Sequence, residues 1–201
     1  MHPGTIIFLN GASSSGKTSL LRALQARLPD PFLDAGIDRF LWMLPGRYLN
    51  RPLWYDVLGL ADRAGDTGLM LISGMHHAIA ALALRGNRVL ADHVLVEPRW
   101  VAECARLFAR LPAYLIGVQC PLEILEQREA ARKDRTLGQA RKQFVAVHAH
   151  KIYDFSVDTG RWLPEECAAL IEDFLASGTP PGAFAALFEQ QYGVQLSTED
   201  A

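Results

Sequence analysis

The chain has 201 residues, of which half are hydrophobic and 21% are charged, as expected for a soluble domain that buries a core. Its formal net charge of −2 gives no basic field for a nucleic-acid backbone, so a nucleic-acid partner is not expected. Three widely spaced cysteines lack metal-binding or redox spacing and are expected to be reduced core residues. We see no signal peptide and no uninterrupted apolar run of membrane-spanning length, and therefore expect a cytoplasmic protein without a membrane partner.

An octapeptide near the N-terminus fits the phosphate-loop pattern G-x-x-x-x-G-K-[ST] at every fixed position. It follows an apolar run, residues 5–10, typical of a buried parallel strand, and precedes leucines at helical spacing. Gly11 and Gly16 can adopt backbone angles that turn successive N–H groups around a phosphate. Lys17 is expected to reach the β- and γ-phosphates, and Thr18 to bind Mg²⁺. A chance glycine-serine turn is the alternative. The predicted nucleotide-binding residues are Gly11, Ala12, Ser13, Ser14, Ser15, Gly16, Lys17 and Thr18.

A second short strand is predicted over residues 32–37 and ends at Asp38. In an open parallel sheet the ligand binds beyond the carboxyl ends of the strands, so Asp38 is expected to face the same crevice as the loop. A carboxylate there can accept the proton of an attacking hydroxyl. Aspartate is equally suited to cap the helix predicted to begin at residue 39, and both roles stay open.

Residues 45–68 are punctuated by glycine and proline, and the aromatic content around them is high. Amphipathic rings suit a substrate pocket, but they also pack satellite cores. The aromatic residues in question are Trp42, Tyr48, Trp54 and Tyr55.

The helix predicted over residues 70–84 carries His76 and His77, which lack other ligands at metal-binding spacing and are expected to pack or to face solvent.

The third predicted strand, residues 88–92, ends in Asp92. A carboxylate at the tip of a buried strand beside a phosphate loop is a usual second anchor for Mg²⁺, directly or through water. Capping of the following segment is the alternative role. We therefore expect Asp92 to act with Thr18 at a metal site.

Three arginines follow the fourth predicted strand, residues 113–120. Arg128, Arg132 and Arg135 are spaced by four and three residues, so they project from one face of a helix. Guanidinium groups on one stripe suit the oxygens of a transferring phosphoryl group. A solvated face paired with nearby acids such as Glu129 is the alternative, but behind a phosphate loop we favour the phosphate role.

The order of these features resembles the nucleotide-kinase branch of the P-loop NTPase fold, an α/β fold whose five-stranded parallel sheet is flanked by helices and carries a lid. More closely, the chain resembles the chloramphenicol phosphotransferase family over most of residues 5–175. The blocks that carry this resemblance are residues 7–18, Gly36-Ile37-Asp38, residues 89–94, Val118-Gln119-Cys120, residues 128–135, Lys142-Gln143, Val147-His148 and residues 153–159.

That family transfers the γ-phosphate of ATP to a hydroxyl of a small antibiotic with the help of Mg²⁺. The resemblance implies that Lys17 and Thr18 bind phosphate and metal. It also implies that Asp38 deprotonates the acceptor hydroxyl and that Arg132 and Arg135 clamp phosphates from the lid.

The chain also departs from the family pattern. Asp92 matches a family acid near the reaction centre, but residues 39–70, which help to form the family's acceptor pocket, match poorly. The resemblance therefore leaves the acceptor open.

We expect a kinase domain over residues 1–178, with a lid at about 128–145, and a C-terminal extension over 179–201. The other predicted elements are helices over 98–111, 138–151, 164–175 and 183–192, the last docking through Phe184, Leu187 and Phe188, and a strand over 155–159.

These features together predict a kinase that uses ATP and Mg²⁺ to phosphorylate a small hydroxylated molecule, with a chloramphenicol-like antibiotic as the first acceptor and antibiotic resistance as the implied role. A nucleotide-binding switch with slow ATPase activity is the alternative from another class. A nucleoside or metabolite kinase would differ only in its pocket. A homo-oligomer is compatible with all three.

Overall fold

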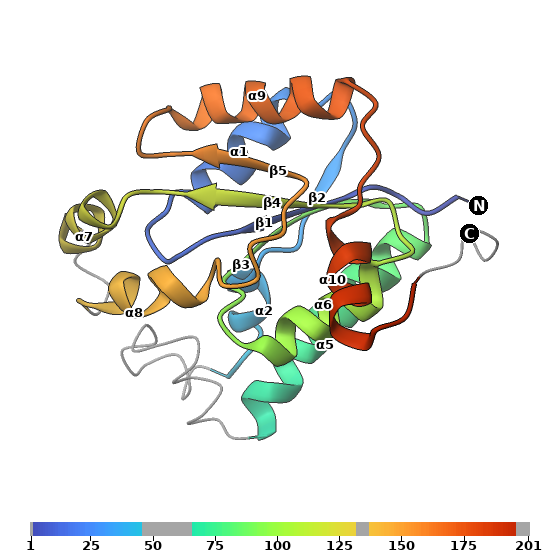
Figure 1. The fold of residues 1–201 in the computed structure, drawn as a ribbon. Helices are drawn as coiled ribbons and strands as arrows, with labels where there is room; N and C mark the ends of the chain where they lie inside the picture. Colours follow the sequence, from blue (N-terminus) through green and yellow to red (C-terminus); the bar gives the residue numbers. More distant parts are fainter. Residues whose placement is uncertain (1, 46–65, 132–136, 196–201) are drawn as a thin grey trace.

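The computed structural model describes residues 2–45, 66–131 and 137–195, which fold around one parallel sheet (Figure 1). The strand order is β2-β3-β1-β4-β5, and every pairing between neighbours is parallel. This arrangement confirms the predicted five-stranded parallel sheet. The strands are β1 (Ile6–Asn10), β2 (Phe32–Asp34), β3 (Arg88–His93), β4 (Ala113–Gln119) and β5 (Phe155–Asp158).

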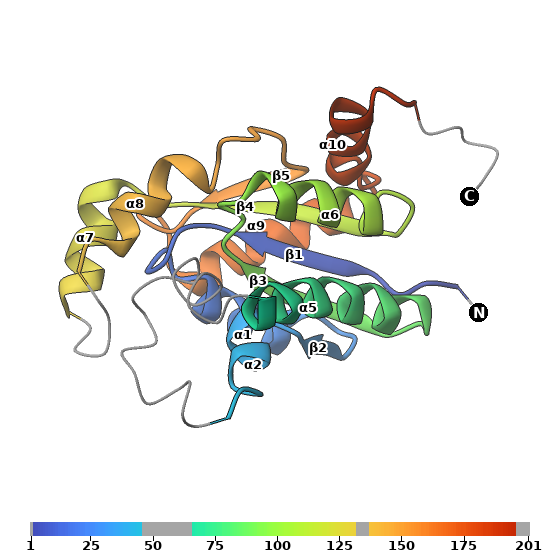
Figure 2. The same ribbon diagram turned by 90° about the horizontal axis from the view of Figure 1, so that it is seen from below.

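Helices cover both faces of the sheet and its carboxyl edge (Figures 1 and 2). One face carries α1 (Lys17–Arg27) and α9 (Pro164–Ala176), and the other carries α5 (Asp66–Leu84), α6 (Pro98–Phe108) and α10 (Ala183–Tyr192). Beyond the carboxyl ends of the central strands lie α7 (Leu122–Ala131) and α8 (Gln139–Ala146), whereas α2 (Ile37–Leu41) follows β2.

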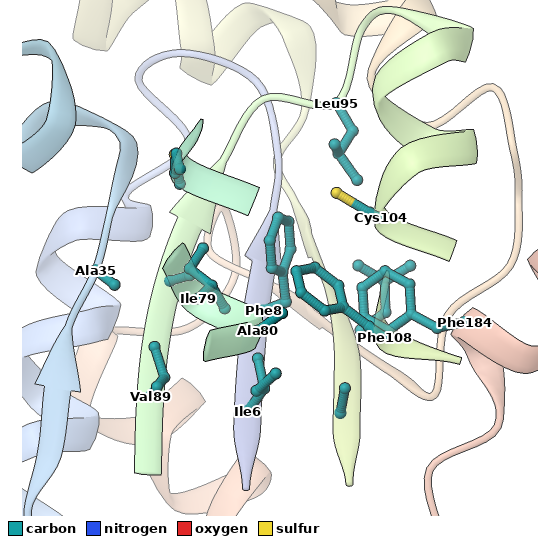
Figure 3. Packing of buried hydrophobic residues seen from close by; sticks show 14 of the residues in the cluster. Ile6, Phe8, Ala35, Ile79, Ala80, Val89, Leu95, Cys104, Phe108 and Phe184 are labelled. Atoms are coloured by element: carbon teal, nitrogen blue, oxygen red, sulfur yellow. The ribbon is translucent and has the colours of Figure 1, made fainter. Parts of the chain in front are cut away.

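The first strand is buried on both faces, which explains its continuous apolar run. Phe8 packs in one core cluster, where its ring lies 5.8 Å from the ring centroids of both Phe108 and Phe184 (Figure 3). Ile7 and Leu9 alternate with it and belong to the cluster beneath α1 and α9. The strand therefore joins two cores while its carboxyl end carries the phosphate loop.

The C-terminal helix α10 packs onto the sheet as its sequence predicts. Phe184 and Leu187 are 2% and 4% exposed, and Phe188 packs at the margin of the same cluster. The carboxylate of Asp154 accepts the two N–H groups at the start of α10, from positions 182 and 183, at 2.7 and 2.9 Å. A carboxylate at a helix N-terminus satisfies otherwise unpaired donors and fixes where the helix docks.

By length and composition, α5 is the one helix in the described part of the chain that could cross a membrane. In this fold it is a core helix, because Ile72, Met75 and Ile79 are buried against the sheet and α6. His76 is fully buried and the side chain of His77 is 51% exposed. The expected packed and solvent-facing roles of these histidines are thus both confirmed.

The predicted strand over residues 32–37 is too long, because β2 ends at Asp34. The side chain of Asp34 accepts the Gly36 N–H at 3.1 Å and turns the chain, and α2 then begins at Ile37 with Gly36 as its N-cap. Asp38 is therefore the second residue of α2. It neither ends a strand nor caps the helix, so the predicted capping role is wrong.

Of two other predicted segments, the aromatic one is described only at its first ring, and one helix is shorter than predicted. Trp42 is 60% exposed, whereas Tyr48, Trp54 and Tyr55 lie outside the described residues. The helix predicted over residues 138–151 ends at Ala146, and residues 147–150 form turns. This turn region brings α8 back to β5.

Candidate active site

The phosphate loop, residues 11–16, joins β1 to α1. Gly16 has φ 85° at the N-cap of α1, and Ser14 has φ 64°, so both adopt left-handed backbone conformations. Gly11 lacks the special backbone angles that the sequence analysis predicts for it, but a Cβ there would lie 2.6 Å from the Val118 carbonyl oxygen. It is required for close packing against β4 rather than for a positive φ.

Lys17, the first residue of α1, is only 7% exposed. Its Nζ donates a hydrogen bond of 2.7 Å to the carbonyl oxygen of Ala12, near the start of the loop. The ammonium group thus reaches from the helix back across the loop. A positive charge held there can neutralise an anion surrounded by the loop N–H groups.

Thr18 and Asp92 meet at the carboxyl edge of the sheet. The Thr18 hydroxyl donates to Oδ2 of Asp92 at 3.0 Å, and Asp92 is 6% exposed. Burial raises the pKa of Asp92, while the positive charge of Lys17 opposes this rise. The structure therefore brings together the two residues that the sequence predicts as metal ligands.

The turn after β2 places Asp38 in the same neighbourhood. A Cβ on Gly36 would collide with Oδ1 of Asp92, so only glycine lets this turn approach the carboxylate so closely. Asp38 is half-buried two residues later, and its negative charge contributes to the raised pKa of Asp92. The carboxylates of Asp38 and Asp92 are thus close enough at the edge of the sheet for the charge of one to affect the other.

The donor set fits a magnesium ion shared with nucleotide phosphates. Mg²⁺ prefers hard oxygen ligands and often binds through one or two protein side chains together with substrate phosphates. The Thr18 hydroxyl and the Asp92 carboxylate provide such oxygens next to the loop. Within the described ranges, no group of three or more histidine, cysteine or acidic side chains could form an all-protein metal site.

A cavity of about 400 Å³ opens on the other side of the loop. Arg128 lines it and is held by Thr159, whose carbonyl oxygen accepts from the guanidinium at 2.6 Å. The Thr159 hydroxyl in turn donates to the Ser15 carbonyl oxygen at 2.7 Å, which ties the loop to the end of β5. This cavity is within the usual range for a small ligand. Its lining residues are Ser14, Gly16, Ser19, Arg128, Ala131, Thr159, Trp162 and Pro164.

The sequence model of the family described as chloramphenicol phosphotransferase-like protein matches residues 4–176. The chain belongs to the chloramphenicol phosphotransferase-like family. A Mycobacterium tuberculosis protein of strain H37Rv, whose name describes it as a candidate O-phosphotransferase, is 33% identical over 197 residues. The match covers 92% of this chain and 88% of that protein. This family member is therefore a kinase-like phosphotransferase.

Solved structures with the same fold are P-loop kinases and related proteins. The APS kinase CysC of Mycobacterium tuberculosis, in complex with AMPPNP and APS, has a TM-score of 0.59 at 19% identity and matches 88% of this chain and 99% of that one. Shikimate kinase from Acinetobacter baumannii has a TM-score of 0.61 at 17% identity, covering 89% and 96% of the two chains. The tunicamycin resistance protein of Deinococcus radiodurans has a TM-score of 0.60 at 16% identity, covering 89% and 98%. These likenesses confirm the P-loop kinase fold of this family member.

The predicted arginine stripe is described only at its first member. Arg128 lies beside the loop, with one guanidinium nitrogen 3.7 Å from where a Cβ on Gly16 would lie. Arg132 and Arg135 lie outside the described residues. Contact of these three arginines with phosphate remains a prediction for this member of the chloramphenicol phosphotransferase-like family.

The sequence interpretation misses two buried side chains of the segment predicted to form a lid, residues 128–145. Glu129 is 2% exposed and accepts the N–H groups of Gly138 and Ala140 at 2.7 and 2.8 Å, so it anchors the start of α8 instead of forming an exposed ion pair. Gln143 is 1% exposed and binds the Ser13 N–H. The sequence signal for Gln143 is the Lys142-Gln143 pair in the family resemblance, but the sequence alone assigns it no role.

Proposed function

We propose that this protein transfers the γ-phosphate of ATP to a hydroxyl group of a small molecule, with a chloramphenicol-like antibiotic as the first acceptor to test. The observation that carries the proposal is the arrangement at the carboxyl edge of the sheet. There the Lys17 ammonium crosses the phosphate loop, Thr18 binds Asp92, and Asp38 lies in the first turn of the neighbouring helix α2. Family membership supports phosphotransfer, and the loop supports a nucleotide as the donor.

The division of roles follows from charge. Lys17 and the loop N–H groups stabilise negative charge on the β- and γ-phosphates of ATP. A bound Mg²⁺, held by Thr18 and Asp92, would supply further neutralisation of phosphate charge. Asp38 orients the acceptor hydroxyl and accepts its proton as the oxygen attacks the γ-phosphorus. The bond from that phosphorus to the bridging oxygen breaks, and ADP leaves.

Two parts of the proposal concern residues outside the described ranges. Arg132 and Arg135 would clamp the transferring phosphoryl group from the lid, with Arg128 at the nucleotide. In the family, residues 39–70 help to form the acceptor pocket, and positions 46–65 of that stretch also lie outside the described ranges. The identity of the acceptor depends on that pocket.

The test is a screen of acceptors. The protein is incubated with ATP, Mg²⁺ and individual hydroxylated antibiotics, nucleosides and sugars, and each compound is examined by mass spectrometry for the gain of one phosphoryl group. We expect a product with at least one compound and ADP release that depends on that compound. Slow ADP release that no hydroxylated compound stimulates would contradict the proposal and favour a nucleotide-dependent switch.

A further inference from the structure

Gln143, on the inner side of α8, contacts the phosphate loop directly. Its side chain is 1% exposed, and its Oε1 accepts the Ser13 N–H at 2.8 Å. A backbone N–H can only donate, so this bond fixes the orientation of the side-chain amide. The oxygen binds the loop, and the NH₂ group occupies the other side of the amide.

That NH₂ group has no partner within the described structure. Nε2 of Gln143 is buried and makes no hydrogen bond there, and two hydroxyls of the phosphate loop, those of Ser14 and Ser15, are buried and unbonded as well. A buried donor left without an acceptor is unfavourable, so native proteins rarely retain one without a reason. Next to an anion-binding loop, the missing acceptor is most simply an oxygen of the anion.

The position of Gln143 is fixed from both ends of α8. At the start of the helix, Glu129 accepts two backbone N–H groups. Just after its end, the Val147 carbonyl oxygen accepts from Nδ2 of Asn10 at 2.8 Å, and Asn10 is the last residue of β1. Between these anchors, Ala140 packs in the same buried cluster as Ala12 of the loop. Gln143 is thus presented to the loop by rigid elements, as a preorganised binding group requires.

The location favours the terminal phosphoryl group over the inner phosphates. Inner phosphates lie against the N-terminus of the helix that follows a phosphate loop, which here is α1. Ser13 belongs to the opposite part of the loop, adjacent to Ala12, to which the Lys17 ammonium reaches. Because that ammonium serves the β- and γ-phosphates, the Gln143 amide lies on the γ-phosphate side.

We propose that Gln143 is a phosphate-binding residue whose Nε2 donates a hydrogen bond to an oxygen of the terminal phosphoryl group of ATP while Oε1 holds the Ser13 N–H. This inference rests on the proposed use of ATP. It makes α8 a sensor of the γ-phosphate and gives the protein a preference for ATP over ADP. The competing interpretation is that Gln143 only fastens α8 to the loop.

Substitutions at position 143 separate the two interpretations. Gln143→Glu keeps the shape and an oxygen that accepts from Ser13, but it replaces the donor with a second oxygen. Gln143→Met keeps the length and removes both polar groups. The matched control is Gln127→Glu, which makes the same chemical change at an exposed position on the neighbouring helix α7.

The readout is the ratio of the dissociation constants for ADP and ATP, measured with Mg²⁺ by calorimetry on each full-length variant. For Gln143→Glu we expect ATP binding to weaken by about tenfold or more, as for the loss of a hydrogen bond to a charged group, with ADP binding within about threefold of wild type. Gln143→Met should shift the ratio in the same direction, and Gln127→Glu should not. Equal losses for ATP and ADP, or no loss, would overturn the inference in favour of a purely structural contact.

This measurement needs no acceptor, so its outcome is separate from that of the proposed function. Loss of ATP preference in the Gln143 variants, together with failure of every acceptor, would retain the inference and remove the phosphotransferase proposal. An unchanged ratio together with a phosphorylated acceptor would remove the inference and retain the phosphotransferase proposal. A wild-type protein that binds no ATP would contradict both.

Discussion

The hydroxyl of Thr18 donates a hydrogen bond of 3.0 Å to the carboxylate of Asp92, which links the first turn of α1 to the end of β3. The two residues are 74 positions apart in the chain and meet because β1 and β3 are adjacent in the sheet, with Leu9 paired to Asp92. This contact sets two oxygen ligands beside the phosphate loop. It is the structural basis of the proposed magnesium site.

Replacing Asp92 should therefore change the metal requirement. In Asp92→Asn the amide oxygen still accepts from Thr18, but the negative charge that attracts a divalent cation is lost. We expect half-maximal activity to require about tenfold more Mg²⁺, with little change in metal-free nucleotide binding. Asp30→Asn is the control, because that carboxylate forms an exposed ion pair with Arg88 at 3.0 Å. An Mg²⁺ titration that superimposes on that of wild type would rule out the metal role.

Two acids of α7 reach α8, and they should differ greatly in their effect on stability. Glu129 is buried and accepts two N–H groups, whereas Glu126 forms an exposed ion pair with Arg141 at 2.6 Å. We expect Glu129→Ala to lower the free energy of unfolding by about 2–4 kcal/mol, because it leaves buried donors unpaired. Glu126→Ala should cost less than about 1 kcal/mol. Urea unfolding measures both, and similar losses would show that Glu129 is not an anchor.

A buried chain of polar side chains predicts a specific dependence of stability on pH. The Val94 N–H donates to Nδ1 of His93 at 2.7 Å, so neutral His93 carries its proton on Nε2. Nε2 of His93 lies 3.1 Å from Nε2 of His76, and the opposite nitrogen of His76 binds Glu103. Burial holds the pKa of His93 well below its usual value. The hydrogen bond from His76 lowers the pKa of Glu103 to about 2.

Because the folded pKa of Glu103 lies below its unfolded value, its contribution to stability is complete above about pH 4.5 and is lost as the pH falls toward 2. Allowing for partial exposure of the side chain, we expect Glu103→Gln to lower the free energy of unfolding by about 1–3 kcal/mol at neutral pH. The difference from wild type should shrink at pH 3, as measured by urea unfolding at both pH values. A difference that is the same at both would contradict this origin.

The C-terminal helix should be part of the cooperative fold, although the family match ends at residue 176. Phe184 is 2% exposed and lies 5.1 Å from the Phe108 ring (Figure 3). We expect Phe184→Ala to destabilise the protein by about 3–5 kcal/mol through the lost burial and the cavity it leaves. The control Tyr192→Ala removes a ring that is 45% exposed and should have a much smaller effect. Thermal unfolding would contradict the assignment if both variants melted alike.

The parts of the fold that local sequence determines could be predicted. The phosphate loop is contiguous, and the apolar run of β1 and the amphipathic pattern around Phe184 each report on one element. The position of Asp38 could not be predicted, because the Asp34 side chain and Gly36 turn the chain before the expected end of the strand. The hydrophobic pattern of a segment cannot show that a side chain, and not a neighbouring strand, will bind the backbone N–H groups at its end.

Contacts between distant residues account for most of what the sequence left unassigned. Gln143 binds a loop residue 130 positions away, so no periodicity or motif spacing could indicate it. The guanidinium of Arg128 donates to Thr159, 31 residues further along the chain, and the two residues meet because β5 pairs with β4. Spacing along a helix therefore does not show which partner an arginine such as Arg128 binds.

The central claim is that Asp38 acts on the acceptor while Lys17 acts on the nucleotide. The most direct test is to measure turnover and ATP affinity together for Asp38→Asn and Lys17→Ala, with chloramphenicol or the first acceptor that the screen identifies. We expect Asp38→Asn to lower kcat by about 10²–10⁴-fold with ATP affinity nearly unchanged, and Lys17→Ala to weaken ATP binding itself. Wild-type turnover in Asp38→Asn, or equal losses of ATP affinity in the two variants, would contradict the account.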